Sequence, residues 1–276
     1  MEQVLKTMLE NVRAKTPLVH NITNYVTVND VANVLLAAGG SPIMSDDADD
    51  VEDITSICGG LNINIGTLNK NTIPSMFLAG KKANALGHIV LLDPVGAGAS
   101  RLRTDTANRL MQEVRFDAVR GNISEIKTLC TGSGSTKGVD ADAVDAVTEA
   151  NLDDGVQLVK AFAQRAGCIV AVTGAIDLVS DGARCWCIRN GRAEMSRITG
   201  TGCQLSALMT AFLVANPDHK LDAAAAAVCM MGLAGEIGWA NMQPGDGNST
   251  YRNRIIDAIF NMTGDALEEG AKYELR

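Results

Sequence analysis

The sequence has few aromatic residues, few prolines and few histidines, and it shows no cluster of positive charge. Aromatic residues make up 4% of the 276 positions, and the chain holds six prolines and three histidines. Lysine and arginine number 24 against 32 aspartates and glutamates, which gives a formal net charge of −8. A chain of this charge without a basic patch is a poor partner for nucleic acid or for an anionic membrane.

The seven cysteines lack the spacing of a metal site or a disulfide framework. They are scattered, no two form a CxxC pair, and several lie inside apolar runs such as residues 168–170. We therefore expect reduced, mostly structural thiols in a cytoplasmic protein. No histidine lies near a pair of cysteines, which argues against zinc.

The chain also shows neither a leader nor a membrane span that we can identify. Residues 1–15 are charged and amphipathic and have no apolar core, so they do not resemble a signal peptide. The longest stretch of low charge, residues 221–239, is rich in alanine but contains Asp222 and Glu236. We predict a buried helix there, and no transmembrane segment.

The sequence is rich in apolar residues, and their pattern predicts alternating strands and helices. Hydrophobic residues make up 46% of the chain and charged residues 20%. Such alternation predicts one α/β domain over residues 1–276, with three α/β/α layers and a mainly parallel central sheet covered by helices on both faces. An Asp-Gly turn predicts a strand pair over 178–191, and everything after it is expected to be helical, ending with one helix over 249–269. The other expected strands span residues 17–22, 41–44, 61–66, 88–93, 116–122 and 168–174.

Two polar stretches are assigned no chemistry. The acidic run at residues 46–53 is interpreted as a solvated helix start, where carboxylates meet the positive end of the helix dipole. The stretch at 131–138 superficially resembles a phosphate-binding loop but lacks the Gly-Lys-Ser/Thr ending and a strand that leads into it. We interpret it as a surface loop.

The most informative stretch is residues 198–213, which predicts a helix that begins near Cys203 behind Gly200 and Gly202. Free backbone N–H groups at the positive end of a helix suit a phosphate, or a charge that develops during a reaction. A thiol at this end is expected to lose its proton more readily than an exposed one. The alternative is a glycine-rich connection that only lets the helix pack closely on the sheet.

Other polar residues are expected to join this helix start, because ligands of parallel sheets bind beyond the carboxyl ends of the strands. Asp93, Arg120 and Thr173 fall at or near predicted strand ends, with Arg120 expected at its strand's tip, and Glu125 opens the next helix. With a nucleoside triphosphate as ligand, Asp93 and Glu125 could serve Mg²⁺ and Arg120 could hold phosphate oxygens. The amides of residues 200–203 could then stabilise the transferred phosphoryl group. The alternatives are a helix cap for Asp93, a first-turn carboxylate for Glu125 and a surface ion pair for Arg120.

With these residues in place, the chain resembles the hydroxyethylthiazole kinase family, which belongs to the ribokinase-like superfamily. The likeness extends over roughly residues 16–212. It is carried by segments in the family's order, namely Pro17–Asn24, Gly40–Met44, Asp93–Ala99, Arg120–Glu125, Val172–Gly174 and Gly200–Cys203.

The resemblance implies a ribokinase-like fold and ATP-dependent phosphorylation of the hydroxyl of 4-methyl-5-(2-hydroxyethyl)thiazole, in thiamin salvage. It also implies a homotrimer with active sites between subunits. In this trimer the segments around Asn24 and Met44 face the Cys203 loop of a neighbouring chain. The residue roles that it implies are ATP contacts from Arg120 and Thr173, Mg²⁺ at Asp93 and Glu125, and thiazole contacts from Met44 and Gly200 with Asn24 nearby. The anion hole at Gly202 is expected from the helix start itself.

Cys203 is the unusual residue of this resemblance, since superfamily relatives place an aspartate there as the base for the substrate hydroxyl. A loose phosphoryl-transfer transition state needs little prior deprotonation, so a weaker base can serve. Our hypothesis is that Cys203 orients the hydroxyl and accepts its proton late. The alternative is that it only fills space.

Four other functions stay open at this point. A kinase of another small alcohol, such as hydroxymethylpyrimidine, is the nearest. A dinucleotide oxidoreductase would need a third glycine after Gly200 and Gly202. A cysteine hydrolase would need a histidine beside Cys203, for which His20 is the nearest candidate. A non-catalytic protein of this fold would bind ATP or thiazole without turnover.

Overall fold

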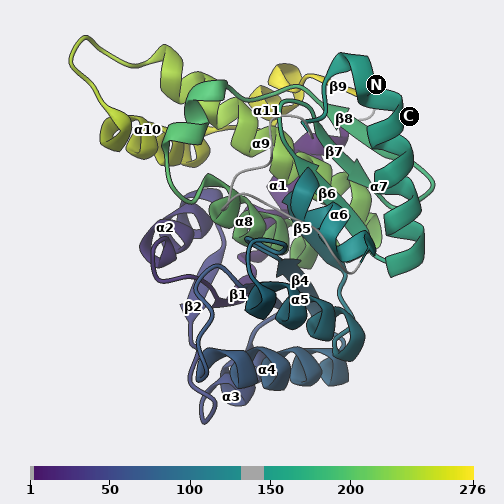
Figure 1. Cartoon of the computed structure of the whole chain (residues 1–276). Helices are drawn as coiled ribbons and strands as arrows, with labels where there is room; N and C mark the ends of the chain where they lie inside the picture. Colours follow the sequence, from purple (N-terminus) through teal and green to yellow (C-terminus); the bar gives the residue numbers. More distant parts are fainter. Residues whose placement is uncertain (1–2, 132–145) are drawn as a thin grey trace.

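The computed structural model describes residues 3–131 and 146–276 (Figure 1). The surface loop expected over residues 131–138 lies, except for its first residue, outside the described residues. Within the described part, all strands join one nine-stranded sheet in the order β2-β1-β3-β4-β5-β6-β7-β8-β9.

The first six strands of this order are parallel, as the alternation of strands and helices predicts. Each strand is followed by a helix that returns the chain to the other edge, so all six carboxyl ends lie along one edge of the sheet. These strands are β1 (Leu18–Ile22), β2 (Ser41–Met44), β3 (Gly60–Asn64), β4 (Ile89–Asp93), β5 (Ala118–Asn122) and β6 (Ile169–Thr173).

An antiparallel extension follows the parallel part. The predicted strand pair is confirmed as β7 (Asp177–Ser180) and β8 (Cys185–Ile188). A third strand, β9 (Tyr273–Leu275), pairs with β8 at the edge. The expectation that everything after residue 191 is helical is therefore wrong. Three residues are too few to show strand alternation, and pairing with a distant strand leaves no local signal.

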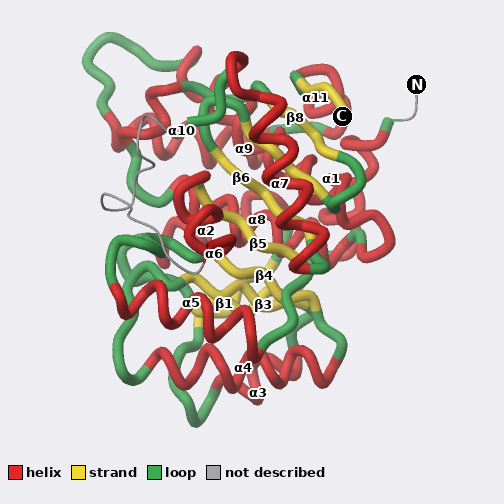
Figure 2. The backbone as a smooth tube through the Cα atoms, turned by 45° about the vertical axis from the view of Figure 1, so that its right-hand side comes forward, coloured by secondary structure: helices red, strands yellow, loops and turns green. Residues whose placement is uncertain are grey.

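Helices cover both faces of the sheet, which confirms the predicted three layers; Figure 2 shows the strands between the two groups. One face carries α3 (Val51–Ile57), α4 (Thr72–Leu86), α5 (Arg101–Glu113), α6 (Ile123–Thr131) and α7 (Leu152–Ala166). The other carries α1 (Val4–Lys15), α2 (Val28–Ala38), α8 (Thr201–Ala215), α9 (Lys220–Ala240), α10 (Asn248–Asn261) and α11 (Gly264–Gly270).

The alanine-rich stretch forms the core helix α9, as predicted. The segment Pro217–Ala240 is long and apolar enough to cross a membrane, but 78% of its apolar window is buried inside the protein. It packs against α8 and α10 and against the sheet. This packing accounts for its composition.

The single helix expected over residues 249–269 is wrong, because the chain forms two helices there. α10 ends at Asn261, and Thr263 caps α11 by accepting a hydrogen bond from the Ala266 N–H at 3.1 Å. Threonine is a preferred residue at a helix start. This signal was concealed because the apolar periodicity of the sequence continues across Thr263.

Candidate active site

Side chains from four neighbouring strands converge on the face of the sheet that α8 covers. Strand side chains alternate between faces, so a residue two positions after one that packs toward α8 also points there. Leu91, Ala118 and Ala171 belong to the core cluster that contains α8 and α9. The residues that point the same way from the carboxyl halves of these strands are Asp93, Arg120 and Thr173, and Asn64 of β3 lies opposite Asp93 in register.

Asp93 is buried and only partly satisfied. Its Oδ2 accepts hydrogen bonds from Asn64 Nδ2 at 2.8 Å and from Ser206 Oγ at 2.7 Å. Its Oδ1 has no hydrogen-bond partner within residues 3–131 and 146–276. Burial raises the pKa of this carboxyl, and the charge of Arg120 and the two hydrogen bonds offset part of that rise. Because Ser100 caps α5, the helix-cap alternative for Asp93 is wrong.

Arg120 is a buried residue in the middle of β5, so the expectation that it stands at the strand tip is wrong. Its Nη2 donates to Thr173 Oγ1 at 2.5 Å, and its Nη1 lies 3.6 Å from Asp93 Oδ2. Only 9% of the residue is exposed, which excludes the surface ion pair.

The guanidinium of Arg120 also lies against the N-terminal end of α8. A β-carbon added at Gly202 would stand 2.5 Å from Arg120 Nη1. Both groups are positive, since the helix dipole adds partial positive charge at this end. Asp93 lies beside Arg120, and the carboxylates of Glu125 and Asp177 also lie close enough to interact with its charge. This arrangement favours an anion at the start of α8.

Glu125, in the first turn of α6, binds two loop backbones rather than facing solvent. Its Oε1 accepts from the Gly96 N–H at 2.8 Å and its Oε2 from the Asn122 N–H at 2.7 Å. Burial, and next the charge of Asp93, raises its pKa to about 7. The carboxylate thus holds the β4–α5 loop against the end of β5.

This raised pKa makes folding stability depend on pH. The folded state binds the Glu125 proton more tightly than the unfolded state, so this group's stabilisation falls as pH rises from about 4.5 to about 7. We expect chemical denaturation, without nucleotide or divalent cation, to show that decline, and Glu125→Gln to flatten it.

The readout is the slope with pH rather than the absolute stability, because a glutamine amide cannot accept both backbone N–H groups. The slope should be reduced rather than abolished, since desolvation also raises the pKa values of Asp93 and Asp177. An unchanged slope in Glu125→Gln would contradict the assignment.

Cys203 is buried beside this cluster as a protonated thiol. Its Sγ accepts hydrogen bonds from Asn24 Nδ2 at 3.0 Å and Asn64 Nδ2 at 3.2 Å. Burial, followed by the charge of Asp93, raises the pKa of the thiol. The expectation that its helix position makes it lose its proton more readily is therefore wrong. Desolvation outweighs the dipole at this depth.

Gly200 lets α8 start where it does. The helix begins at Thr201, two residues before Cys203, and Gly200 precedes it in a left-handed conformation with φ +86°. A β-carbon there would collide with the side chain of Thr27. Thr27 Oγ1 in turn donates to Asn24 Oδ1 at 3.1 Å.

The two residues expected to face the Cys203 loop of a neighbouring chain already lie beside it in their own chain. Asn24 donates directly to the Cys203 sulfur, and Met44 packs against the small apolar cluster that contains Cys203. The contacts expected with a neighbouring chain stay a prediction. The turn after β1 and the end of β2 thus complete one side of the site.

His20 has a different task from that of a catalytic base. Its Nδ1 lies 2.9 Å from Thr55 Oγ1 and its Nε2 2.8 Å from the Ser45 carbonyl oxygen. Burial lowers its pKa, which favours the neutral ring. Both ring nitrogens are thus engaged away from Cys203, which removes the cysteine-hydrolase alternative that relied on His20. The ring instead holds the backbone directly after Met44.

Two residues that the sequence analysis passed over are central to the site. Asn64 joins Asp93 to Cys203, and Ser206 donates to Asp93 from one turn further along α8. Asn64 had a detectable signal, since it ends an alternating strand with a polar residue on the Asp93 side. Ser206 had only its spacing of three from Cys203 on a mostly apolar helix that also carries Gln204 and Thr210.

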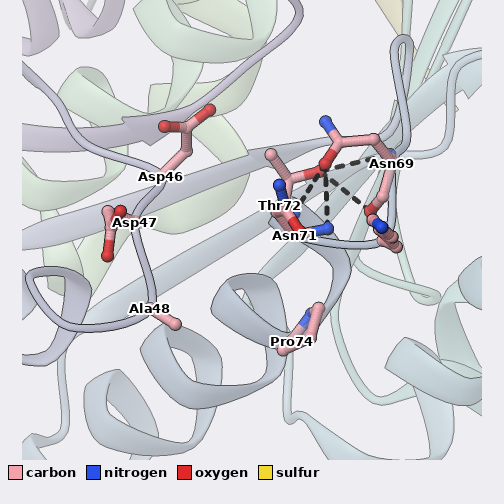
Figure 3. Close-up of a pocket in the computed structure, with 8 residues that line it drawn as sticks. Asp46, Asp47, Ala48, Asn69, Asn71, Thr72 and Pro74 are labelled. Carbon is pink, nitrogen blue, oxygen red and sulfur yellow. Dashed lines mark hydrogen bonds between the residues drawn. The ribbon is translucent and has the colours of Figure 1, made fainter.

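A separate pocket lies away from these residues. It has a volume of about 540 Å³ and is lined by the loops after β2 and β3, including Asp46, Asp47 and Lys70 (Figure 3). Its Asn69 side chain accepts the N–H groups of Asn71 and Thr72 at the start of α4, so this amide is already used. The pocket shares no residue with the strand-end cluster.

Comparisons with known proteins agree on one family. The chain matches the hydroxyethylthiazole kinase family over residues 9–265. It is 57% identical over 271 residues to a hydroxyethylthiazole kinase of Clostridium acetobutylicum, covering 98% of this chain and 99% of that protein.

Solved structures give the same result. The structure of a hydroxyethylthiazole kinase from Pyrococcus horikoshii OT3 superposes with a TM-score of 0.87 at 32% identity, over 99% of this chain and 98% of that one. A pyridoxal kinase from Staphylococcus aureus superposes with a TM-score of 0.63 at 14% identity, over 94% and 97%. The second likeness concerns the fold alone.

Proposed function

Because the chain belongs to the hydroxyethylthiazole kinase family, we propose that the strand-end cluster transfers the γ-phosphoryl group of ATP to the side-chain hydroxyl of 4-methyl-5-(2-hydroxyethyl)thiazole. The chain is a thiamin-salvage kinase with a ribokinase-like α/β/α fold. The observation that supports the site assignment is the guanidinium of Arg120 against the start of α8, next to an Asp93 oxygen that has no partner among the described residues.

In this proposal Arg120, Thr173 and the amides around Gly202 bind the phosphates of ATP. The guanidinium can contact two phosphate oxygens, and Thr173 fixes its orientation through the 2.5 Å hydrogen bond. The backbone N–H groups at the start of α8 point at the group in transfer. Phosphoryl transfer relies mainly on positioning and charge stabilisation, which fixed donors of this kind supply.

Asp93 and Glu125 are proposed to serve Mg²⁺, which typically takes one or two carboxylates together with phosphate oxygens and water. The residues fit such an ion. Asp93 Oδ1 is buried without a partner among the described residues. Burial raises the pKa of both carboxyl groups, and a bound cation would favour their charged forms. When bound, the ion would neutralise charge on the phosphate oxygens.

The acceptor alcohol is proposed to lie on the opposite side, between Met44, Gly200 and Asn24. These residues lie around Cys203. The side chain of Asn64 donates to both Cys203 Sγ and Asp93 Oδ2 and so links the two residues. Since the thiol is protonated, its first role is to orient the acceptor hydroxyl toward the phosphate. Acceptance of the proton by sulfur would require prior loss of the thiol proton.

Substitutions at Cys203 separate these roles. Cys203→Ala should lower kcat about tenfold through lost orientation, with little change in KM for ATP. Cys203→Asp should retain or raise activity, because a carboxylate there accepts the Asn24 and Asn64 amide protons and can also act as a base. Steady-state kinetics measure both. Turnover of Cys203→Ala close to wild type would reduce Cys203 to a packing residue.

We also propose that residues 1–276 act as one domain in a cytoplasmic homotrimer with active sites between subunits. The shared nine-stranded sheet supports one domain. Tyr25 and Val26, next to Asn24, are 77% and 56% exposed, and such apolar side chains beside a site suit a subunit contact.

The decisive experiment measures ADP release by the purified protein with Mg²⁺-ATP, with and without hydroxyethylthiazole, and checks the product by mass for one added phosphate. We expect release that depends on thiazole and yields this product. Stimulation by another alcohol only would reassign the acceptor side while keeping the ATP site. No ADP release with any alcohol would instead favour a binding protein.

A further inference from the structure

Arg103, in the first turn of α5, stands between two loops of the site without belonging to the strand-end cluster. Its Nη2 donates to the Gly66 carbonyl oxygen at 2.7 Å, in the loop after β3. Its Nη1 lies so close to Gly96, in the loop after β4, that a β-carbon at Gly96 would overlap it. The guanidinium pairs with no carboxylate of the described residues, so it is not an ordinary surface ion pair.

The contact with Gly66 leads to the thiol. The Gly66 N–H donates to Asn64 Oδ1 at 2.9 Å, and a β-carbon at Gly66 would lie 3.1 Å from the Asn24 side chain. Asn24 and Asn64 are the two amides that donate to Cys203 Sγ. Fixing the Gly66 carbonyl therefore fixes both donors of the sulfur.

The contact with Gly96 leads to the carboxylates. The Gly96 N–H donates to Glu125 Oε1 at 2.8 Å, and Gly96 lies in the turn directly after Asp93. This turn is tied to α5 itself, since the Gly98 N–H donates to Thr104 Oγ1 at 2.9 Å. Arg103 thus touches the same loop that Glu125 holds from the other side.

We propose that Arg103 is a positioning residue that locks the acceptor side and the carboxylate side of the site into one register. A guanidinium is planar and presents several donors, so it can hydrogen-bond one loop while its face fills the space left by a glycine in the other. The role at Cys203 rests on the proposed function. The positioning of the Gly66 and Gly96 loops by Arg103 can be observed without catalysis.

The test compares Arg103→Met and Arg103→Lys with Arg101→Met, a matched arginine on the same helix whose side chain is 95% exposed. In the wild-type enzyme, phosphorylation of the thiazole is established first. Arg103→Met should then lower kcat about tenfold or more with a small change in KM for ATP, because sub-ångström misplacement costs rate rather than binding. Arg103→Lys should recover only part of the loss, and Arg101→Met should match wild type.

An activity-independent readout uses alkylation of the ligand-free protein by iodoacetamide, followed site by site with peptide mass spectrometry. Loosening of Gly66 should speed alkylation of Cys203 about fivefold in Arg103→Met, while Cys130, a half-buried thiol elsewhere, keeps its rate. Equal acceleration at both thiols would show general loosening and overturn the proposal. So would an unchanged Cys203 rate, whatever the outcome of the kinase assay.

Discussion

Replacing Asp93 with asparagine is expected to lower kcat by about a hundredfold or more while leaving the fold intact. The amide oxygen can still accept hydrogen bonds from Asn64 and Ser206, and its NH₂ takes the position of the unpartnered Oδ1. The charge that faces Arg120 and the proposed Mg²⁺ is lost. Steady-state kinetics over a range of Mg²⁺ concentrations should show that more Mg²⁺ no longer restores the rate.

Asp93→Asn also removes the counter-charge of the buried Arg120, which stays charged, so the folded state should lose stability. Thermal unfolding measures this loss, and kcat is compared at a temperature at which both proteins are folded. The matched control is Asp105→Asn on α5, an exposed carboxylate paired with Arg101, which should leave both rate and stability unchanged. A kcat within threefold of wild type in Asp93→Asn would remove Asp93 from the chemistry.

The second large effect is expected at Arg120. Arg120→Met should destabilise the fold by about 3–5 kcal/mol, because it leaves Asp93 buried without its counter-charge. It should also lower kcat/KM for ATP by about a hundredfold to a thousandfold, since both the proposed phosphate contact and the link to Thr173 are lost. Denaturation and ATP kinetics on the same preparation measure the two losses.

Arg120→Lys distinguishes charge from geometry. An ammonium restores the counter-charge to Asp93, so stability should return to a large extent. It cannot reproduce the planar fork that contacts Thr173 while lying against Gly202, so activity should stay low. Full recovery of both would mean that any cation suffices. The exposed Arg109, replaced by lysine, serves as the control.

The strand positions of the site residues could be predicted because parallel β/α units have a strong local signature. Asp93 and Thr173 end apolar strands, and Gly200 and Gly202 precede a helix with an apolar face, so each was found from its neighbours in the chain. The family resemblance then supplied the proposed roles of Met44 and Asn24.

Other features depend on tertiary packing and were not predictable from local pattern. Arg120 looked like a strand tip because charged residues usually end strands, yet its guanidinium is buried by Thr173, Asp93 and Gly202. The helix position of Cys203 predicted a lowered thiol pKa. Its burial raises the pKa instead, and the depth of burial cannot be read from the neighbouring sequence. β9 exists only because β8 offers it a partner.

The site brings together residues that are far apart in the chain. Asn24 and Asn64 reach Cys203 across 179 and 139 positions, and Ser206 reaches Asp93 across 113. Contacts of such high sequence separation close long loops, and the entropy of that closure slows folding. A nascent or truncated chain that lacks α8 has neither Cys203 nor Ser206, so it cannot complete the proposed phosphate site. Substrates then act as reporters of complete folding, and at a hundred times its dissociation constant a ligand adds about 2.7 kcal/mol to the stability of the finished protein alone.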